Sequence, residues 1–116
     1  MSNATKPLED VMNHIEKTFE GSVDRLADFL RIPSVSTDPA HDEDTHRCAE
    51  FASDMLAEIG FSARVVKTDG HPMVVAHRDG PAADSPRVLY YGHYDVQPPD
   101  PIELWNHEAF DPVVVD

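Results

Sequence analysis

The apolar residues of the first thirty positions recur at steps of three and four. They are Leu8, Met12, Ile15, Phe19, Val23, Leu26 and Leu30. A helix turns once in about 3.6 residues, so this spacing predicts one long amphipathic helix. Pro7 suits its first turn, and Pro33 ends the pattern. Gly21 predicts a kink or a division within the helix.

A second helix is expected after an extended connector at 31–37 and an acidic loop at 38–44. Glu43 and Asp44 near its start suit the positive end of a helix dipole. Gly60 is a typical residue for ending it. The apolar face of this helix comprises Cys48, Phe51, Ala52, Met55, Leu56 and Ile59.

Beyond Gly60 the pattern changes to short strand-like runs. Strands are predicted at 61–66, 73–76, 88–91 and 113–115, with an extension of the second to His77 left open. The run at 88–91 is almost entirely apolar, which is typical of a strand covered on both faces. Two helices followed by strands predict an α/β fold, with the helices packed on a partial mixed sheet.

Composition limits the size and the partners of this fold. A chain of 116 residues with 41% hydrophobic residues fits at most one domain with a packed core. The net charge of −13 makes nucleic acid and anionic membranes poor partners, because binding phosphate requires Lys and Arg. No apolar run approaches the roughly 20 residues of a membrane span, and the first residues lack a signal-peptide layout. A cytoplasmic protein is the simplest expectation.

Several residues that invite a chemical role have simpler interpretations. Cys48 is the single cysteine, so an internal disulfide is excluded and a small buried side chain is expected. His41 and His46 are five apart and do not share a helix face, so both are predicted to be surface residues. Ser34 and Ser36 lack the glycine-flanked elbow of a nucleophile and are predicted to be structural.

His93 and Asp95 follow the predicted strand at 88–91 and form the strongest candidate site. Neutral imidazole is a good zinc ligand, and its other nitrogen usually donates to a carboxylate. Residues two apart in an extended chain point to the same face, and α/β proteins bind ligands beyond the carboxyl ends of strands. The spacing by itself still favours a structural role, since polar residues at strand ends readily bond loop backbone groups.

The surrounding residues make the motif far more specific. Val88-Leu89-Tyr90-Tyr91-Gly92-His93-Tyr94-Asp95-Val96-Gln97-Pro98-Pro99 is followed by Leu104-Trp105 and then Phe110-Asp111-Pro112. This string closely resembles the co-catalytic zinc peptidases that include carnosine-type dipeptidases, acetylornithine deacetylase, succinyl-diaminopimelate desuccinylase and glutamate carboxypeptidase. Tyr94 and the Gln-Pro-Pro and Leu-Trp elements resemble the dipeptidase-like branch most. Earlier segments agree, namely Leu30-Arg31-Ile32-Pro33-Ser34-Val35-Ser36 and Ile59-Gly60-Phe61.

The resemblance implies roles for both residues of the motif. His93 matches the family's first zinc-ligand histidine, and Asp95 matches the carboxylate that orients this histidine and is counted among the catalytic residues. Two zinc ions in a complete active site would activate a water, with a downstream glutamate as general base. The implied reaction is hydrolysis of an amide bond in a dipeptide or an N-acylated amino acid.

The match is incomplete. The family's bridging aspartate, its Glu-Glu pair, its later ligands and its lid or dimerisation domain all lie beyond the equivalent of Asp116. His71, His77 and His107 offer no evident substitute, and a catalytic zinc normally has three protein ligands. Residues 1–116 are therefore expected to be a truncated N-terminal segment of a metallopeptidase catalytic domain, inactive alone. The alternative is a non-catalytic acidic α/β interaction module that retains only the start of the peptidase fold.

The apolar run at 113–115 would leave an exposed strand edge and face at a cut boundary. Poor solubility, self-association or a homo-oligomer is therefore expected for the isolated chain.

Overall fold

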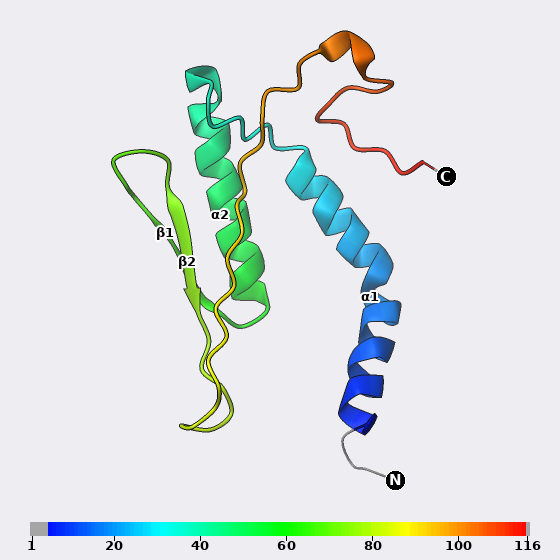
Figure 1. Cartoon of the computed structure of the whole chain (residues 1–116), viewed down its shortest axis with the longest axis vertical. Helices are drawn as coiled ribbons and strands as arrows, with labels where there is room; N and C mark the ends of the chain where they lie inside the picture. The colour runs from blue at the N-terminus through cyan, green and yellow to red at the C-terminus, as the bar shows by residue number, and fades with distance from the viewer. Residues whose placement is uncertain (1–4, 116) are drawn as a thin grey trace.

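The computed structural model describes residues 5–115, and it has the predicted α/β composition (Figure 1). In chain order the elements are helix α1 (Thr5–Leu30), the 3-10 turn η1 (Pro39–His41), helix α2 (Asp42–Glu58), strands β1 (Ser62–Val66) and β2 (Met73–His77), and the 3-10 turn η2 (Ile102–Leu104). Within the described range, no helix combines the length and the apolarity that crossing a membrane requires.

Helix α1 runs without interruption for 26 residues, so the division predicted at Gly21 is wrong. Gly21 lies on an exposed part of the helix, where a glycine costs about 1 kcal/mol of helix stability but does not break the hydrogen-bond ladder. The hydroxyl groups of Thr18 and Ser22 also bond to the helix backbone. Each donates to the carbonyl four residues earlier, at 2.9 and 3.1 Å respectively.

Both ends of the second helix follow from local chemistry. Asp38 caps the preceding η1 turn, where its Oδ1 accepts from the Ala40 amide at 2.9 Å. Three acidic residues occupy the first turn of α2, as its dipole favours. At the other end Gly60 has a φ of +92°, a left-handed conformation that glycine adopts without a steric penalty. The predicted stop at Gly60 is confirmed.

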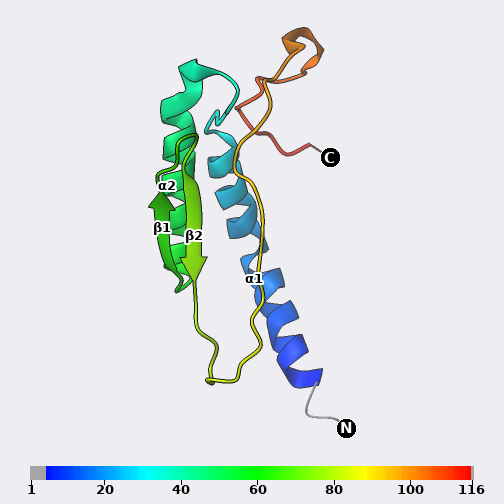
Figure 2. The same ribbon diagram turned by 60° about the vertical axis from the view of Figure 1, so that its left-hand side comes forward.

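Helix α2 packs against the hairpin formed by β1 and β2 (Figure 2). The strands are antiparallel, with Ser62 opposite His77 and Val66 opposite Met73. The extension of the second strand to His77 is therefore confirmed. Val74 and Ala76 are half-buried while their neighbours are exposed, which is the alternation of a strand with one covered face.

The buried residues come from the connector after α1 and from the inner face of α2. They are Ile32, Ser34, Val35, Thr45, Cys48, Ala49 and Ser53. The core thus lies where the connector, α2 and the segment around Tyr94 meet, and it leaves most of α1 outside. Phe29 stacks on Phe51 with ring centroids 5.8 Å apart, which ties the end of α1 to α2.

Two strand predictions are wrong for the described residues. The runs at 88–91 and 113–115 belong to no strand among residues 5–115, and Leu89 and Tyr91 are each 94% exposed. Apolar strands of this kind need neighbours on both faces, which the described part of the chain does not supply. The sheet is accordingly one antiparallel pair, and a single parallel bridge, Val35 to Val96, lies apart from it.

The apolar stripe of α1 is also more exposed than a core-facing stripe should be. Leu8 is 63% exposed and Phe19 is 61% exposed. The spacing predicted the helix correctly, but the apolar stripe of an amphipathic helix normally faces a core, and this stripe is largely exposed among the described residues. Helix periodicity reports which face is apolar and not whether a partner covers it.

These surfaces predict self-association of the isolated 116-residue chain, because large contiguous apolar patches drive association. Light scattering should give an average mass that rises with concentration. The double substitution Leu89→Lys with Tyr91→Lys should lower that mass, whereas Tyr90→Phe, which keeps the surface apolar, should not. A wild-type chain that remains monomeric at high concentration would refute the prediction.

Candidate functional site

The segment that carries His93 and Asp95 runs beside the connector that follows α1. Val96 pairs with Val35 in the parallel bridge, and its amide donates to the Ser34 carbonyl at 3.0 Å. The Ser34 hydroxyl donates in turn to the Tyr94 carbonyl at 2.8 Å. Since Ser34 and Val35 are almost fully buried, this pairing fixes the backbone on which the candidate site is built.

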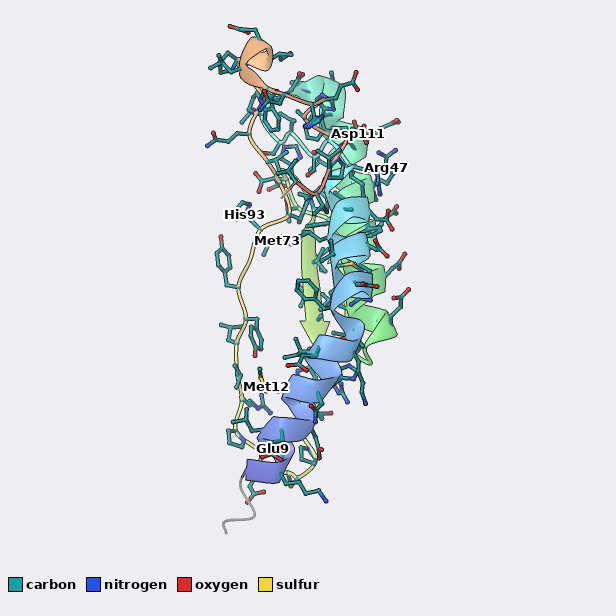
Figure 3. The ribbon with its side chains drawn as sticks, turned by 90° about the vertical axis from the view of Figure 1, so that its right-hand side faces the viewer. Glu9, Met12, Arg47, Met73, His93 and Asp111 are labelled. Carbon is teal, nitrogen blue, oxygen red and sulfur yellow. The ribbon has the colours of Figure 1, made fainter. Side chains whose placement is uncertain are left out.

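The structure brings His93 and Asp95 into contact. The His93 Nδ1 lies 3.1 Å from Oδ1 of Asp95 and 2.9 Å from the main-chain carbonyl of the same residue. Both partners are acceptors, so Nδ1 is the donor, and in a neutral imidazole Nε2 then carries the lone pair. The His93 side chain is 74% exposed and points away from the helices (Figure 3). The available nitrogen is thus presented at the surface.

Asp95 is held on its other side by the connector. Its Oδ2 accepts a hydrogen bond of 2.7 Å from the hydroxyl of Ser36. This bond is the main cause that lowers the pKa of Asp95; burial opposes it, and the contact with His93 lowers the pKa further. Asp95 is therefore an ionised carboxylate that faces His93.

Tyr94 lies between the two residues in sequence but takes the opposite direction, as expected for successive residues of an extended chain. Its hydroxyl donates to the Pro72 carbonyl, and its own carbonyl accepts from Cys48 Sγ at 3.6 Å. Burial raises the pKa of Tyr94. The bond from its hydroxyl anchors the segment, while His93 is exposed and Asp95 is half-buried against Ser36.

Cys48 has the buried position predicted for it, with 1% of its surface exposed. Burial raises the pKa of the Cys48 thiol, so little thiolate is present at neutral pH. An aromatic disulfide reagent should therefore leave Cys48 unmodified in the folded chain and should modify it fully in urea. Stoichiometric reaction of the folded chain within the mixing time would contradict this.

The other histidines lie in separate surroundings. His41 pairs with Asp44 at 2.8 Å, and His77 pairs with Asp79 at the same distance. His71 approaches the candidate site, where its Nε2 lies 2.6 Å from the Ser36 carbonyl. No sequence pattern indicated this contact, which joins residues 35 positions apart. Ser36, predicted to be merely structural, likewise proves to touch the candidate site.

The residues present fit a metal site only in part. Nε2 of His93 is a suitable ligand for one coordination position, whereas a catalytic zinc normally has three protein ligands. Within residues 5–115, no group of three or more His, Cys, Asp or Glu side chains is placed to hold a metal ion. The described residues therefore do not complete a metal centre, and no reaction step through a metal follows from them.

Comparison with known proteins gives related sequences and a related structure, although no protein-family model matches the chain. A Cys-Gly metallodipeptidase of Candida albicans is 32% identical over 116 residues, which cover 90% of this chain and 24% of that protein. A succinyl-diaminopimelate desuccinylase of Bordetella avium is 32% identical over 94 residues, covering 81% of this chain and 22% of that protein.

One solved structure that matches is the dipeptidase Dug1p from Saccharomyces cerevisiae. It has a TM-score of 0.82 and 29% sequence identity, and it covers 93% of this chain and 25% of that chain. The chain thus spans about a quarter of the length of the relatives that it matches.

Proposed function

Since the chain is homologous to the N-terminal part of a hydrolase family that includes Cys-Gly metallodipeptidases and succinyl-diaminopimelate desuccinylases, we propose that it supplies one corner of the metal centre of a zinc-dependent amide hydrolase. His93 is the metal ligand in this proposal, and Asp95 is the carboxylate that orients it. Two zinc ions would complete the centre together with residues outside the described range.

The observation that carries the proposal is the pair of acceptors beside Nδ1 of His93. Two oxygens of Asp95 accept from Nδ1, so that in a neutral imidazole Nε2 carries the lone pair on an exposed side chain. Metal-bound histidines commonly donate their second nitrogen to a carboxylate or a backbone carbonyl, which fixes the tautomer and raises the basicity of the ligand. When bound, zinc would polarise the scissile carbonyl and activate a water.

The proposed substrates are dipeptides or N-acylated amino acids, with dipeptides preferred because the similarity to the Cys-Gly metallodipeptidase covers 90% of this chain. The proposed setting is cytoplasmic. Residues 1–116 are proposed to be part of a catalytic domain and to be inactive alone, because residues 5–115 offer His93 as a ligand but no group of three that could hold a metal ion.

The test uses the protein at its natural length, meaning residues 1–116 with any residues that the gene encodes around them. Cys-Gly, other dipeptides and N-succinyl amino acids should be offered before and after removal of metal by a chelator. We expect dipeptide hydrolysis that is lost with the metal and returns with added zinc, and no hydrolysis by the 116-residue chain. Full activity in the metal-free protein would refute the proposal.

A protein that neither hydrolyses these substrates nor binds stoichiometric zinc would favour the other interpretation, a non-catalytic acidic α/β interaction module. The exposed apolar residues of α1 and of 88–91 are the observations that this alternative would explain. Elemental analysis of the purified protein separates the two interpretations.

A further inference from the structure

Ser36 occupies a defined place beside the candidate site, opposite His93. Its hydroxyl donates to one oxygen of Asp95 at 2.7 Å, while the other oxygen of Asp95 lies 3.1 Å from His93 Nδ1. The bond from Ser36 is in the distance range of charge-assisted hydrogen bonds, which are about twice as strong as neutral ones. A chain of three side chains therefore runs from Ser36 through Asp95 to His93.

The hydroxyl of Ser36 is itself held in place by its backbone. The preceding residues, Ser34 and Val35, are 1% and 2% exposed and pair with the 94–96 segment. On the other side, the carbonyl of Ser36 contacts His71 Nε2 at 2.6 Å. The donor is thus fixed before any ligand binds, as a positioning group needs to be.

We propose that Ser36 is a positioning residue for His93, acting through Asp95; this inference rests on the proposed function. A carboxylate bonded only to His93 is free to rotate about its side-chain torsions. The bond from Ser36 fixes Oδ2, so that Oδ1 stays directed at Nδ1 and the imidazole keeps one orientation. The result is a higher affinity of Nε2 for a metal ion.

The proposed effect is on ring orientation and affinity rather than on the tautomer. The main-chain carbonyl of Asp95 also accepts from Nδ1, at 2.9 Å, and holds the proton there without Ser36. Loss of the Ser36 hydroxyl should therefore weaken metal binding without abolishing it. Groups that hydrogen-bond a metal-bound histidine typically change metal affinity by about 10- to 100-fold. Ser36 acts on His93 through Asp95, so its loss is expected to have an effect at the lower end of this range.

Ser85 provides a matched control, because it is also a half-buried serine but lies in the loop after β2. Its hydroxyl oxygen accepts a hydrogen bond from the Ala82 amide at 3.0 Å. Ser85→Ala should therefore have little effect on metal affinity. Ser36→Ala should lower metal affinity, and Ser36→Thr, which keeps a hydroxyl on a half-buried position, should retain it.

The experiment measures zinc affinity by competition with a chromogenic chelator in the natural-length protein, together with the urea midpoint of each variant. We expect Ser36→Ala to bind zinc about tenfold more weakly, with Ser36→Thr and Ser85→Ala within about twofold of wild type. Wild-type affinity in Ser36→Ala, or equal losses in Ser36→Ala and Ser85→Ala, would overturn the inference and leave the proposed function standing. A wild-type protein that binds no zinc would overturn both.

Discussion

Replacing His93 with alanine is expected to abolish metal-dependent hydrolysis in the natural-length protein. The groups that merely orient a metal ligand already affect affinity by about 10- to 100-fold, so loss of a ligand should cost more than about 100-fold in kcat/KM and should reduce bound zinc. The side chain is 74% exposed, so the free energy of unfolding should change by less than about 0.5 kcal/mol. Activity, zinc content and urea unfolding measured on one preparation test all three expectations.

The chain contains a second His-x-Asp pair that serves as the control. Asp79 lies two residues after His77, as Asp95 does after His93. The His77 and Asp79 side chains contact each other at 2.8 Å, and both are exposed. His77→Ala should leave activity and zinc content unchanged. Equal losses in His77→Ala and His93→Ala would show that the His93 pair has no special role.

Asp95→Asn should have the second largest effect. The amide keeps an acceptor for Ser36 but loses the charge that faces His93, so zinc affinity should fall by about 10- to 100-fold. Chelator competition measures this affinity. The conservative exchange Asp79→Asn, in the second pair, is the matched control and should leave the affinity unchanged. An Asp95→Asn protein with wild-type affinity would remove Asp95 from the proposed site.

The same substitution has a predicted dependence on pH. The pKa of Asp95 is lowered in the folded chain, so its ionisation stabilises the fold above the ordinary pKa of an aspartate. That stabilisation is lost as the pH falls through the lowered value. Asp95→Asn should therefore be less stable than wild type near neutral pH, and the difference in urea midpoint should shrink in strong acid. A difference that grows on acidification would contradict the assigned shift.

The helices could be predicted from the sequence because their determinants are local. The three- and four-residue spacing in α1 and the glycine at position 60 act over a few neighbouring residues. The strands expected at 88–91 and 113–115 do not form in the described part of the chain, because their apolar residues require covering neighbours on both faces. The sequence pattern does not show whether the chain provides those neighbours. The exposure of these two runs, and that of Leu8 and Phe19, is what the pattern alone did not predict.

The candidate site divides in the same way. Contact between His93 and Asp95 was foreseeable from the two-residue repeat of an extended chain. The contacts of Ser36 and His71 were not foreseeable, because they join residues far apart in the sequence. Ser36 and Asp95 are 59 positions apart, and His71 and Ser36 are 35 positions apart. Only the fold, which places the connector beside the 94–96 segment, brings these residues together. The roles of His93 and Asp95 in catalysis remain predictions.

Locating the metal by anomalous diffraction at the zinc edge tests the central claim most directly. Crystals of the natural-length protein grown with zinc should show an anomalous peak about 2.0–2.1 Å from His93 Nε2, the usual zinc–imidazole distance. The Asp95 carboxylate should remain in hydrogen-bonding contact with Nδ1 of His93. Zinc bound only at other residues, or bound to His93 through Nδ1 with the contact to Asp95 broken, would contradict the account.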